Sequence, residues 1–308
     1  MATANLRALA RYSDSLSQIY LEHAVIEQEG YSIAAFTPDG RITLPAANLS
    51  TVILGPGTRI THAAIKVLAE CGALVAWTGA EGLSFYASGQ SKTRLSNGIE
   101  HQARHWADPR LHLLVVRRMY QARFSENLAA DLTIEQIRGR EGVRVRDTYQ
   151  RLAKEYGVIW SGRHYDRRSW EEADPINRAL SAANAALYAI VLAGLHSLGY
   201  SPALGFIHTG KQLSFAYDVA DLVKTATSIP AAFEAAANGD EQVESRARRI
   251  LRERCCHERL QDQLTKLLPA LFETTDPDSE ASVSDHVGSL WDPSGIVPGG
   301  IQHGRDDS

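Results

Sequence analysis

The segment Leu204–Lys224 reads LGFIHTGKQLSFAYDVADLVK and carries the most informative residue spacing in the chain. His208 lies in a short stretch bounded by Gly205 and Gly210, and a helix is predicted to begin three residues after the histidine. Polar residues then recur every three or four positions and share one helix face: Lys211, Ser214, Asp218, Asp221 and Thr225. Two carboxylates one turn apart that face an imidazole repel each other unless a cation lies between them. The segment therefore predicts a divalent metal site.

The first part of the chain, residues 1–90, is dominated by strand signals. Short β-branched and apolar runs alternate with turns such as Glu29-Gly30 and Pro38-Asp39-Gly40. Strands are predicted over residues 19–21, 24–26, 31–36, 41–44, 51–54, 73–78 and 83–87. Thr61 is a candidate N-cap for one short helix that ends near Glu70. These signals predict a small, mostly antiparallel β domain with one helix.

The apolar residues then change to a helical period and keep it. Helices are predicted over residues 109–124, 133–156, 175–198, 230–237 and 242–268, besides the helix that begins at Lys211. Pro109 and Pro175 each open a helix at a favourable first-turn position. On the Lys211 helix an apolar stripe would hold the helix against a core: Leu213, Ala216, Ala220 and Val223. The predicted fold class is therefore α+β, with a β domain followed by an all-α domain that carries the active site.

Four regions follow from composition: an N-terminal β domain (1–90), a polar hinge (91–98), an α-helical catalytic domain (99–272) and an acidic disordered tail (273–308). The tail carries eight acidic residues against one arginine, a net charge of −7, which leaves +3 for residues 1–272 out of −4 overall. Residues 136–168 alone carry a net charge of +5. Such a basic run fits either a nucleic-acid contact or a solvated helix face, so charge alone does not decide between them.

The cysteines and the most apolar stretch indicate a cytoplasmic protein. Cys71, Cys255 and Cys256 form no disulfide framework, which is typical of a reducing compartment. No signal peptide is recognisable at the start. The stretch 179–198 is alanine-rich and contains Asn184 and His196, so it favours a buried helix over a membrane span.

Glu141 lies within the apolar stripe of the predicted 133–156 helix, beside Ile137 and Val145. A carboxylate on a core-facing side is costly unless it is paired with a cation or bound to a metal. A simple ion pair with Arg138 or Arg144, both within one helical turn, is one explanation. A metal site shared with His208 and the two aspartates is the other, and its oxygen donors and single imidazole suit Mg²⁺ or Mn²⁺.

Two further patterns have competing interpretations. The spacing of Gly205, Gly210 and Lys211 matches the start of a phosphate-binding P-loop, but residue 212 is glutamine and no parallel strand is predicted before it. The loop 160–170, WSGRHYDRRSW, interleaves aromatic and basic residues. Such a loop can hold a single DNA strand by stacking and phosphate contacts, or can simply be fixed by its own rings.

Several motifs together resemble a known family. They are PGTRITHAAIKVLAECGALVAWTG and FYASGQ in the β region, RGREGVRVRDTY around Glu141, the 160–170 loop, and GFIHTGKQLSFAYDVADLVK. From about residue 14 to residue 268 the chain resembles the CRISPR-associated spacer-acquisition integrases, the catalytic subunit of the adaptation complex, in the subtype that works with Cascade (subtype I-E). The resemblance implies a homodimer that assembles with a small ferredoxin-like partner subunit on DNA, away from any membrane.

The resemblance also implies roles for individual residues. Glu141, His208 and Asp221 would ligate the Mg²⁺ or Mn²⁺ ion, with Asp218 close by and part of the catalytic set. The implied DNA contacts are Arg59, Arg138, Arg163, Tyr165, Trp170, Tyr188, Lys211, Tyr217, Lys224, Arg246 and Arg248. The family commonly has a tyrosine that wedges open the DNA fork, whereas His23 stands there in this chain with Tyr20 nearby.

The reaction implied by the resemblance is DNA integration. A 3′-hydroxyl of a protospacer, a short duplex with splayed 3′ ends, attacks a phosphodiester of the CRISPR repeat, and the metal stabilises the developing charge. Two other functions remain open on the residues alone. The same site would serve a metal-dependent nuclease that cuts branched DNA without joining it, and a DNA scaffold without catalysis would merely pair its carboxylates with cations.

Overall fold

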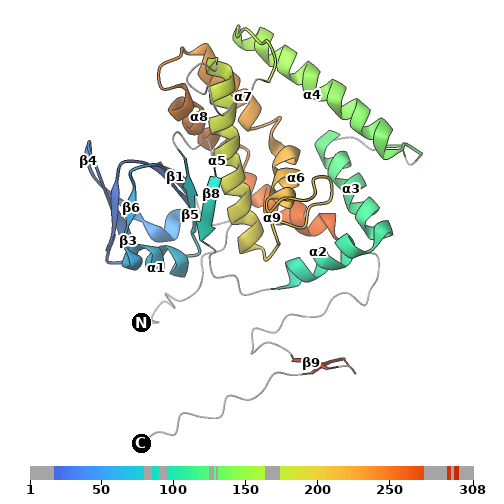
Figure 1. Ribbon diagram of the computed structural model, residues 1–308, viewed down its shortest axis with the longest axis horizontal. Coiled ribbons are helices and arrows are strands. Elements are labelled where there is room, and N and C mark those ends of the chain that lie inside the picture. Colours follow the sequence, from blue (N-terminus) through green and yellow to red (C-terminus); the bar gives the residue numbers. More distant parts are fainter. Residues whose placement is uncertain are drawn as a thin grey trace, which may run out of the picture. The chain divides into compact units, whose positions relative to one another are not determined.

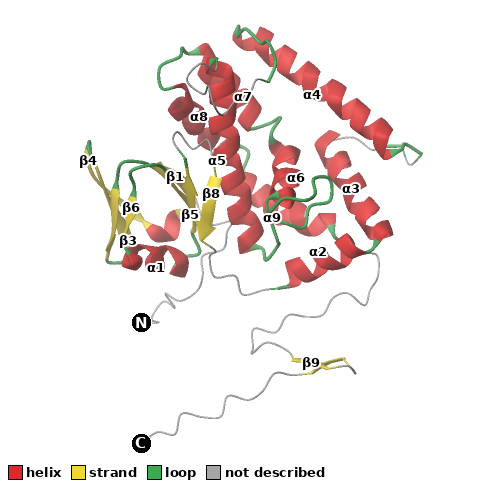
Figure 2. Ribbon diagram, in the orientation of Figure 1, coloured by secondary structure: helices red, strands yellow, loops and turns green. Residues whose placement is uncertain are grey.

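The computed structural model describes residues 17–79, 85–89, 96–124, 128–129, 131–163, 174–273, 290–292 and 295–297. The chain divides into two compact units, Met1–Phe272 and Glu273–Ser308. In the first unit the strands gather in one region and the later helices in another, which confirms the α+β class (Figures 1 and 2). The predicted hinge at 91–98 lies mostly outside the described residues, so the boundary between the two predicted domains stays a prediction.

Among the described residues of the first unit, the β region consists of two four-stranded sheets. The strands are β1 Ser17–Leu21, β2 Val25–Glu29, β3 Ser32–Thr37, β4 Gly40–Pro45, β5 Leu49–Leu54, β6 Arg59–Ile60, β7 Leu74–Thr78 and β8 Phe85–Gly89. One sheet has the order β1-β5-β7-β8 and the other the order β4-β3-β2-β6. The helix α1 (His62–Glu70) begins as predicted, because the Thr61 hydroxyl accepts a hydrogen bond from the Ala64 amide.

The strand pairing differs from the predicted, mostly antiparallel arrangement. In the described part of the chain, β1 with β5, β5 with β7 and β2 with β6 pair in parallel. The pairs β2–β3, β3–β4 and β7–β8 are antiparallel. The antiparallel hairpins carry turn residues that the sequence displays, whereas a parallel pair needs a crossover between distant segments and leaves no local signal.

Eight helices follow within the described residues of the first unit. They are α2 Asn97–Ala107, α3 Pro109–Phe124, α4 Ile134–Tyr156, α5 Pro175–Ser197, α6 Ser214–Val223, α7 Ser228–Ala237, α8 Val243–His257 and α9 Leu260–Leu271. The predicted starts of α3, α4 and α5 are confirmed. Thr133 and Gln136 form a capping box on α4, and Asp174 accepts the Asn177 amide at the start of α5.

Three features of the helical region differ from the sequence prediction. The helix α2 was not predicted. The helix α6 begins at Ser214, so Lys211 lies in the preceding turn and Thr225 lies beyond the end of α6. The predicted helix over 242–268 is interrupted between α8 and α9, where Arg259 has a φ of 49° in the left-handed region. No glycine or proline announces that break, and so the sequence gives no sign of it.

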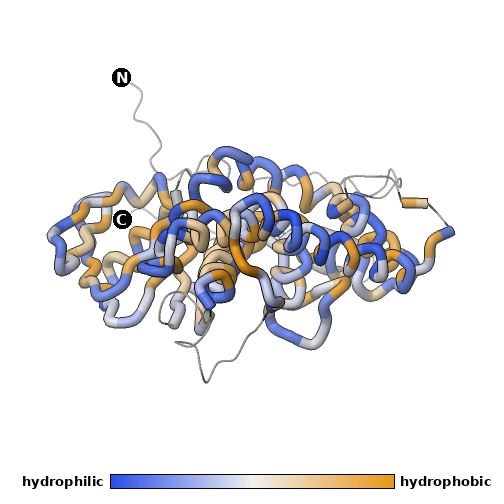
Figure 3. Tube along the Cα trace, turned by 90° about the horizontal axis from the view of Figure 1, so that it is seen from above, coloured by the Kyte–Doolittle hydropathy of each residue, from blue (hydrophilic) through white to orange (hydrophobic). Residues whose placement is uncertain are grey.

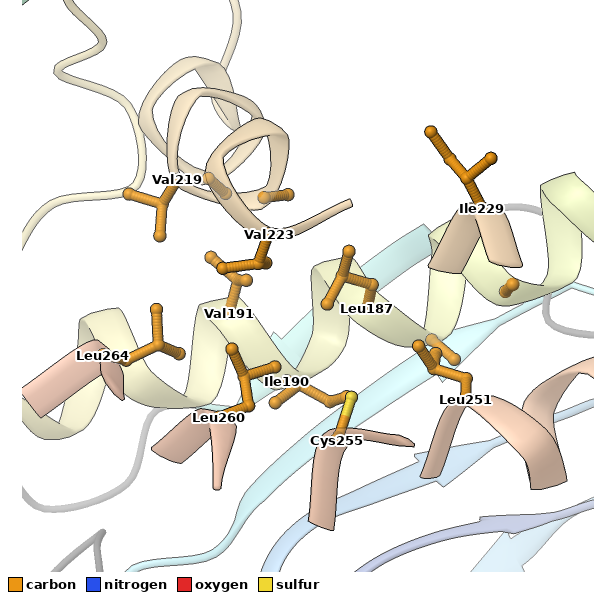
Figure 4. Close-up of a cluster of buried hydrophobic side chains, with 14 of the residues drawn as sticks. Leu187, Ile190, Val191, Val219, Val223, Ile229, Leu251, Cys255, Leu260 and Leu264 are labelled. Carbon is orange, nitrogen blue, oxygen red and sulfur yellow. The ribbon is translucent and has the colours of Figure 1, made fainter. Parts of the chain in front are cut away.

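The helix α5 forms the centre of the larger hydrophobic core. Leu187, Ile190 and Val191 of α5 face side chains from α6, α7, α8 and α9, of which Figure 4 labels Val219, Val223, Ile229, Leu251, Cys255, Leu260 and Leu264. By length and composition α5 could cross a membrane, but 83% of its most apolar window is buried inside the structure. The predicted buried helix is therefore confirmed.

The β region joins this core through one of its sheets. Ile53 of β5 and Leu74 of β7 belong to the same cluster as the side chains of α5. A second cluster lies within the β region and includes Ile26, Val52 and Leu68. Hydrophilic and hydrophobic segments alternate along the chain trace, as they do when each element buries one face (Figure 3).

In the second unit the described residues form two short strands, β9 (Leu290–Asp292) and β10 (Gly295–Val297). They pair in an antiparallel manner, with Trp291 opposite Ile296. Apart from the exposed Glu273, the remaining residues of the predicted acidic tail lie outside the described part of the chain, and the disorder of the tail stays a prediction.

Candidate active site

The loop between α5 and α6 carries His208 and is held by the carboxylate of Asp218. The backbone amides of Phe206 and Ile207 donate to Oδ2 of Asp218 at 2.6 and 3.0 Å, and the His208 amide donates to Oδ1 at 2.8 Å. Asp218 is fully buried. Both carboxylate oxygens therefore accept hydrogen bonds from the loop, and Asp218 acts as a residue that positions the His208 loop.

The imidazole of His208 is oriented by the same carboxylate. Its Nδ1 lies 2.7 Å from Oδ1 of Asp218 and donates to it, because an ionised carboxylate can only accept. This hydrogen bond, partly offset by burial, raises the pKa of His208 above its ordinary value. The opposite nitrogen, Nε2, lies 4.0 Å from Oδ2 of Asp221, and the side chain is 45% exposed. His208 thus turns one ring nitrogen toward Asp221.

Asp221, one turn beyond Asp218 on α6, is held from the other side. The Lys224 ammonium lies 2.6 Å from Oδ1 of Asp221 and donates to the Tyr188 hydroxyl at 2.8 Å. Burial lowers the pKa of Lys224, but the neighbouring Tyr188 and Asp221 outweigh it, so the pKa is raised. Lys224 is therefore a charged partner that fixes the rotamer of Asp221.

Glu141 joins the site through an arginine that the sequence did not indicate. Nη1 of Arg123, at the end of α3, donates to Oε1 of Glu141, and Nη2 lies 3.4 Å from Oδ2 of Asp221. The partners considered from the sequence lie elsewhere: Arg138 is exposed and Arg144 lies over the Phe124 ring at 5.4 Å. One guanidinium therefore links carboxylates from α4 and α6, and no sequence spacing connects Arg123 with either.

The donor set fits a hard divalent cation in kind. It offers two carboxylates and one imidazole nitrogen whose other nitrogen is bonded to a carboxylate, an arrangement that orients metal-ligating histidines. As the side chains now lie, the described residues contain no group of three or more His, Cys, Asp or Glu that could hold a metal ion. Glu141 is paired with Arg123 instead. Binding of a metal by Glu141, His208 and Asp221 stays a prediction.

Two tyrosines lie in a row beside His208. The Tyr217 ring lies edge-on to the His208 ring at 6.1 Å, and the Tyr188 ring lies edge-on to Tyr217 at 5.0 Å. Lys211 is exposed in the turn before α6. The predicted DNA contacts Tyr165 and Trp170 lie outside the described residues.

The predicted DNA-contacting arginines are of two kinds. Arg59 and Arg138 are exposed. The others are bound within the protein: Arg163 donates to Asn177 and to the Ser181 hydroxyl, and Arg246 donates to the Ala235 and Gly239 carbonyls. Arg248 is buried, and its guanidinium lies 4.1 Å from the centre of the Tyr20 ring. The intramolecular bonds of these side chains were not predicted.

The two candidate wedge residues lie at the end of β1. Tyr20 donates to the Glu22 carboxylate at 2.7 Å and packs against Arg248. His23 is exposed in the turn that follows, with a φ of 49°. A non-glycine residue rarely adopts this conformation.

The P-loop interpretation is wrong. The segment from Gly205 to Lys211 follows α5 and a turn rather than a strand, and its backbone amides from 206 to 208 donate to Asp218 rather than remaining free for a phosphate.

A second set of residues, on α2 and α3, supports the His208 loop and was missed from the sequence. Gln102 donates to the carbonyls of Ser201 and Leu204 and accepts the Ser201 amide. Trp106 donates to the Gly205 carbonyl, and Nε2 of His112 lies 3.0 Å from the Phe206 carbonyl. The only sequence sign of this support is a polar, aromatic-containing stretch before Pro109, and that pattern also fits an exposed segment.

Comparison with known proteins gives a consistent family. The model of the family "CRISPR associated protein Cas1" matches residues 119–244, which include Arg123 and all four predicted catalytic residues. The CRISPR-associated endonuclease Cas1 2 of Thermus thermophilus is 50% identical over 307 residues, 98% of this chain and 94% of that protein. The CRISPR-associated endonuclease Cas1 of Escherichia coli K12 is 44% identical over 72% of this chain and 73% of its own.

Solved structures agree with these relatives. A structure described as "Crystal structure of TtCas1-DNA complex" aligns with a TM-score of 0.82 at 50% identity, over 92% of this chain and 100% of its own. A CAS1 protein from Thermotoga maritima aligns with a TM-score of 0.66 over 83% of this chain and 96% of its own, and at 16% identity it supports the fold alone.

Proposed function

Because the chain belongs to the Cas1 family of CRISPR-associated endonucleases, we propose that it is a metal-dependent DNA integrase that inserts protospacer DNA into the CRISPR repeat array. A 3′-hydroxyl of the incoming duplex attacks a phosphodiester at the edge of the repeat. A new oxygen–phosphorus bond forms, the bond to the repeat's own 3′-oxygen breaks, and the proton lost by the attacking hydroxyl is balanced by one taken up at the leaving oxygen. No covalent enzyme intermediate is needed.

One observation carries the proposal: carboxylates from two separate helices meet at one buried cation beside an oriented imidazole. Arg123 contacts Glu141 of α4 and Asp221 of α6, and His208 Nε2 lies 4.0 Å from Asp221. A mere structural ion pair does not need the histidine. A reaction on a phosphodiester, whose negative charge increases in the transition state, is instead served by carboxylates and an imidazole that can hold a divalent cation.

Glu141, His208 and Asp221 are the residues that would hold Mg²⁺ or Mn²⁺. The bound ion would supply charge stabilisation to the phosphoryl and leaving oxygens. The chain's own residues determine the geometry. Asp218 fixes the His208 ring through Nδ1, and Lys224 fixes Asp221 through Oδ1. Asp218 is buried and Lys224 is partly buried, so the protein rather than the solvent determines how these two side chains are oriented.

The proposed partners are DNA and other subunits. A similar solved structure is described as a TtCas1-DNA complex, and the exposed Lys211, Arg59 and Arg138 of this chain offer cationic contacts to a DNA backbone. Tyr217, whose ring lies beside His208, and Tyr188, whose ring lies beside Tyr217, would contact a strand end in this proposal. A homodimer, a small ferredoxin-like partner subunit and the subtype I-E assignment belong to the same proposal.

The test is an integration assay with a labelled duplex that has splayed ends and free 3′-hydroxyls, a repeat-containing plasmid, Mn²⁺ or Mg²⁺, and the small partner subunit. We expect joined product from the wild-type protein and none in EDTA. Glu141→Ala should abolish joining while DNA binding is retained. Glu155→Ala is the matched control, since Glu155 is an exposed glutamate on the same helix that pairs with Arg151.

Two outcomes would reject the proposal in different ways. Metal-dependent cutting without joined product would identify a nuclease, which the names of the relatives also allow. Unchanged DNA transactions in Glu141→Ala would identify a scaffold in which the carboxylates are only ion-paired.

A further inference from the structure

Arg123 is a buried cation at the centre of the candidate active site. Its side chain is 4% exposed, and it reaches Glu141 with Nη1 and Asp221 with Nη2. The guanidinium also lies 5.5 Å from the centre of the Tyr120 ring. Three helices, α3, α4 and α6, therefore meet at this one side chain.

The hydrogen bonding of Arg123 is incomplete. Among the described residues, neither Nε nor Nη2 has a hydrogen-bond partner, although both are buried. The contact of Nη2 with Asp221, at 3.4 Å, is electrostatic rather than a short hydrogen bond. A buried arginine usually has its donors satisfied, because an unpaired buried donor is costly. The unsatisfied donors point to an arrangement that is retained for the charge that it places between the two carboxylates.

We propose that Arg123 is a built-in counter-cation that holds Glu141 and Asp221 in the metal-free site and competes with a divalent ion for them. The inference rests on the proposed function, since it takes the two carboxylates as metal ligands. In the metal-free protein the guanidinium prevents repulsion between the carboxylates. A divalent ion held by these carboxylates would have to displace Arg123 from Asp221 and from Oε1 of Glu141, and the positive charge of Arg123 would oppose the ion.

The competition predicts opposite effects of one substitution on two quantities. Arg123→Met removes the charge but keeps an unbranched side chain that fills similar space. In EDTA its melting temperature should fall, because Glu141 and Asp221 lose their counter-charge. Its affinity for Mn²⁺ should rise, on the order of tenfold, because the competing cation is gone. Arg123→Gln should show the same rise, since its amide can still donate to Glu141 without carrying a charge.

The measurement uses the full-length protein, Mn²⁺ alone, electron paramagnetic resonance of free Mn²⁺, and thermal unfolding with and without the ion. Arg118→Met is the matched control: Arg118 lies on α3 and donates to the Leu271 carbonyl. It should lower the melting temperature equally with and without Mn²⁺ and leave the Mn²⁺ affinity unchanged. Glu141→Ala identifies the Mn²⁺ that is bound at this site.

The outcomes separate this inference from the proposed function. Wild-type binding of Mn²⁺ at the Glu141 site, with equal or weaker binding in both Arg123 variants, overturns the role of Arg123 alone. Tighter binding in Arg123→Met and Arg123→Gln supports it, including the case in which the wild-type protein binds too weakly to detect. Absence of Mn²⁺ binding in the wild type and in both variants overturns the inference together with the proposed metal site.

Discussion

The ring nitrogen Nδ1 of His208 and the backbone amide of the same residue both bind Oδ1 of Asp218, at 2.7 and 2.8 Å. Asp218 therefore fixes the main chain and the imidazole of His208 together. Because the carboxylate comes from α6, the packing of that helix determines where Nε2 of the histidine points. The direction of a candidate metal ligand is thus determined by a buried residue that need not touch the metal.

Asp218→Asn should destabilise the protein and loosen the His208 loop. An amide nitrogen cannot accept hydrogen bonds, so at least one buried backbone donor loses its partner. We expect a loss of about 2–4 kcal/mol in the free energy of unfolding, measured by urea denaturation. Asp147→Asn is the control. Asp147 is exposed, and its ion pair with the exposed Arg146 is long, at 3.7 Å. Equal effects of the two substitutions would contradict the anchoring role.

Gln102→Leu tests the support that α2 gives to the same loop. Gln102 is fully buried, and its side-chain amide makes three hydrogen bonds to the backbone of Ser201 and Leu204. Leucine leaves these groups unpaired, so we expect a loss of about 2–4 kcal/mol and faster hydrogen exchange of the amides from 203 to 208. The exposed Gln150 on α4 provides the control, as Gln150→Leu. Unchanged exchange in the loop would show that α2 does not hold it.

Gly205→Ala and Gly139→Ala should act in opposite directions. A Cβ at Gly205 would lie 2.2 Å from the His208 carbonyl oxygen and 2.6 Å from Cβ of Ser214, so the backbone must shift. We expect a loss of about 1–3 kcal/mol for this overpacking. At Gly139, inside α4, nothing lies within 4 Å of the added atom. Alanine there should stabilise the protein by about 0.5–1 kcal/mol. Urea denaturation of the two variants gives the sign of each effect.

The sequence predicted those elements that carry local chemical signals. Thr61 and Thr133 cap helices, and Pro109 and Pro175 open them, because side-chain oxygens satisfy free amides and proline has no amide to satisfy. The helix α2 lacked such a signal. Its buried face includes Gln102 and His105, which are polar, and so its burial does not appear in a hydrophobic pattern.

The candidate site was predictable only where its residues are close in sequence. The spacing of Asp218 and Asp221 on one helix, after His208, follows from helical geometry. The predicted place of Asp218 close to the metal stays a prediction, but its hydrogen bonds to the loop amides were not predicted, because they depend on a turn whose shape the sequence does not specify. Arg123 was missed because its contacts with Glu141 and Asp221 join three helices, and such contacts depend on tertiary packing.

Acid should destabilise the protein through its buried histidines. Burial lowers the pKa of His196 and of His105 below the ordinary value of 6.5. The unfolded chain therefore binds protons on these residues first, and their contribution to stability, complete above pH 6.5, is lost as the pH falls through 6.5 toward the lowered folded values. His208, whose pKa is raised, contributes with the opposite sign. The change of stability with pH must therefore be compared between the wild type and variants, and not read from the wild type alone.

In urea denaturation at pH 7.5 and pH 5.5, about one unit either side of 6.5, His196→Leu should lose less stability on acidification than the wild type does. His257→Leu, at an exposed position, should match the wild type, and an undiminished acid loss in His196→Leu would refute the assignment.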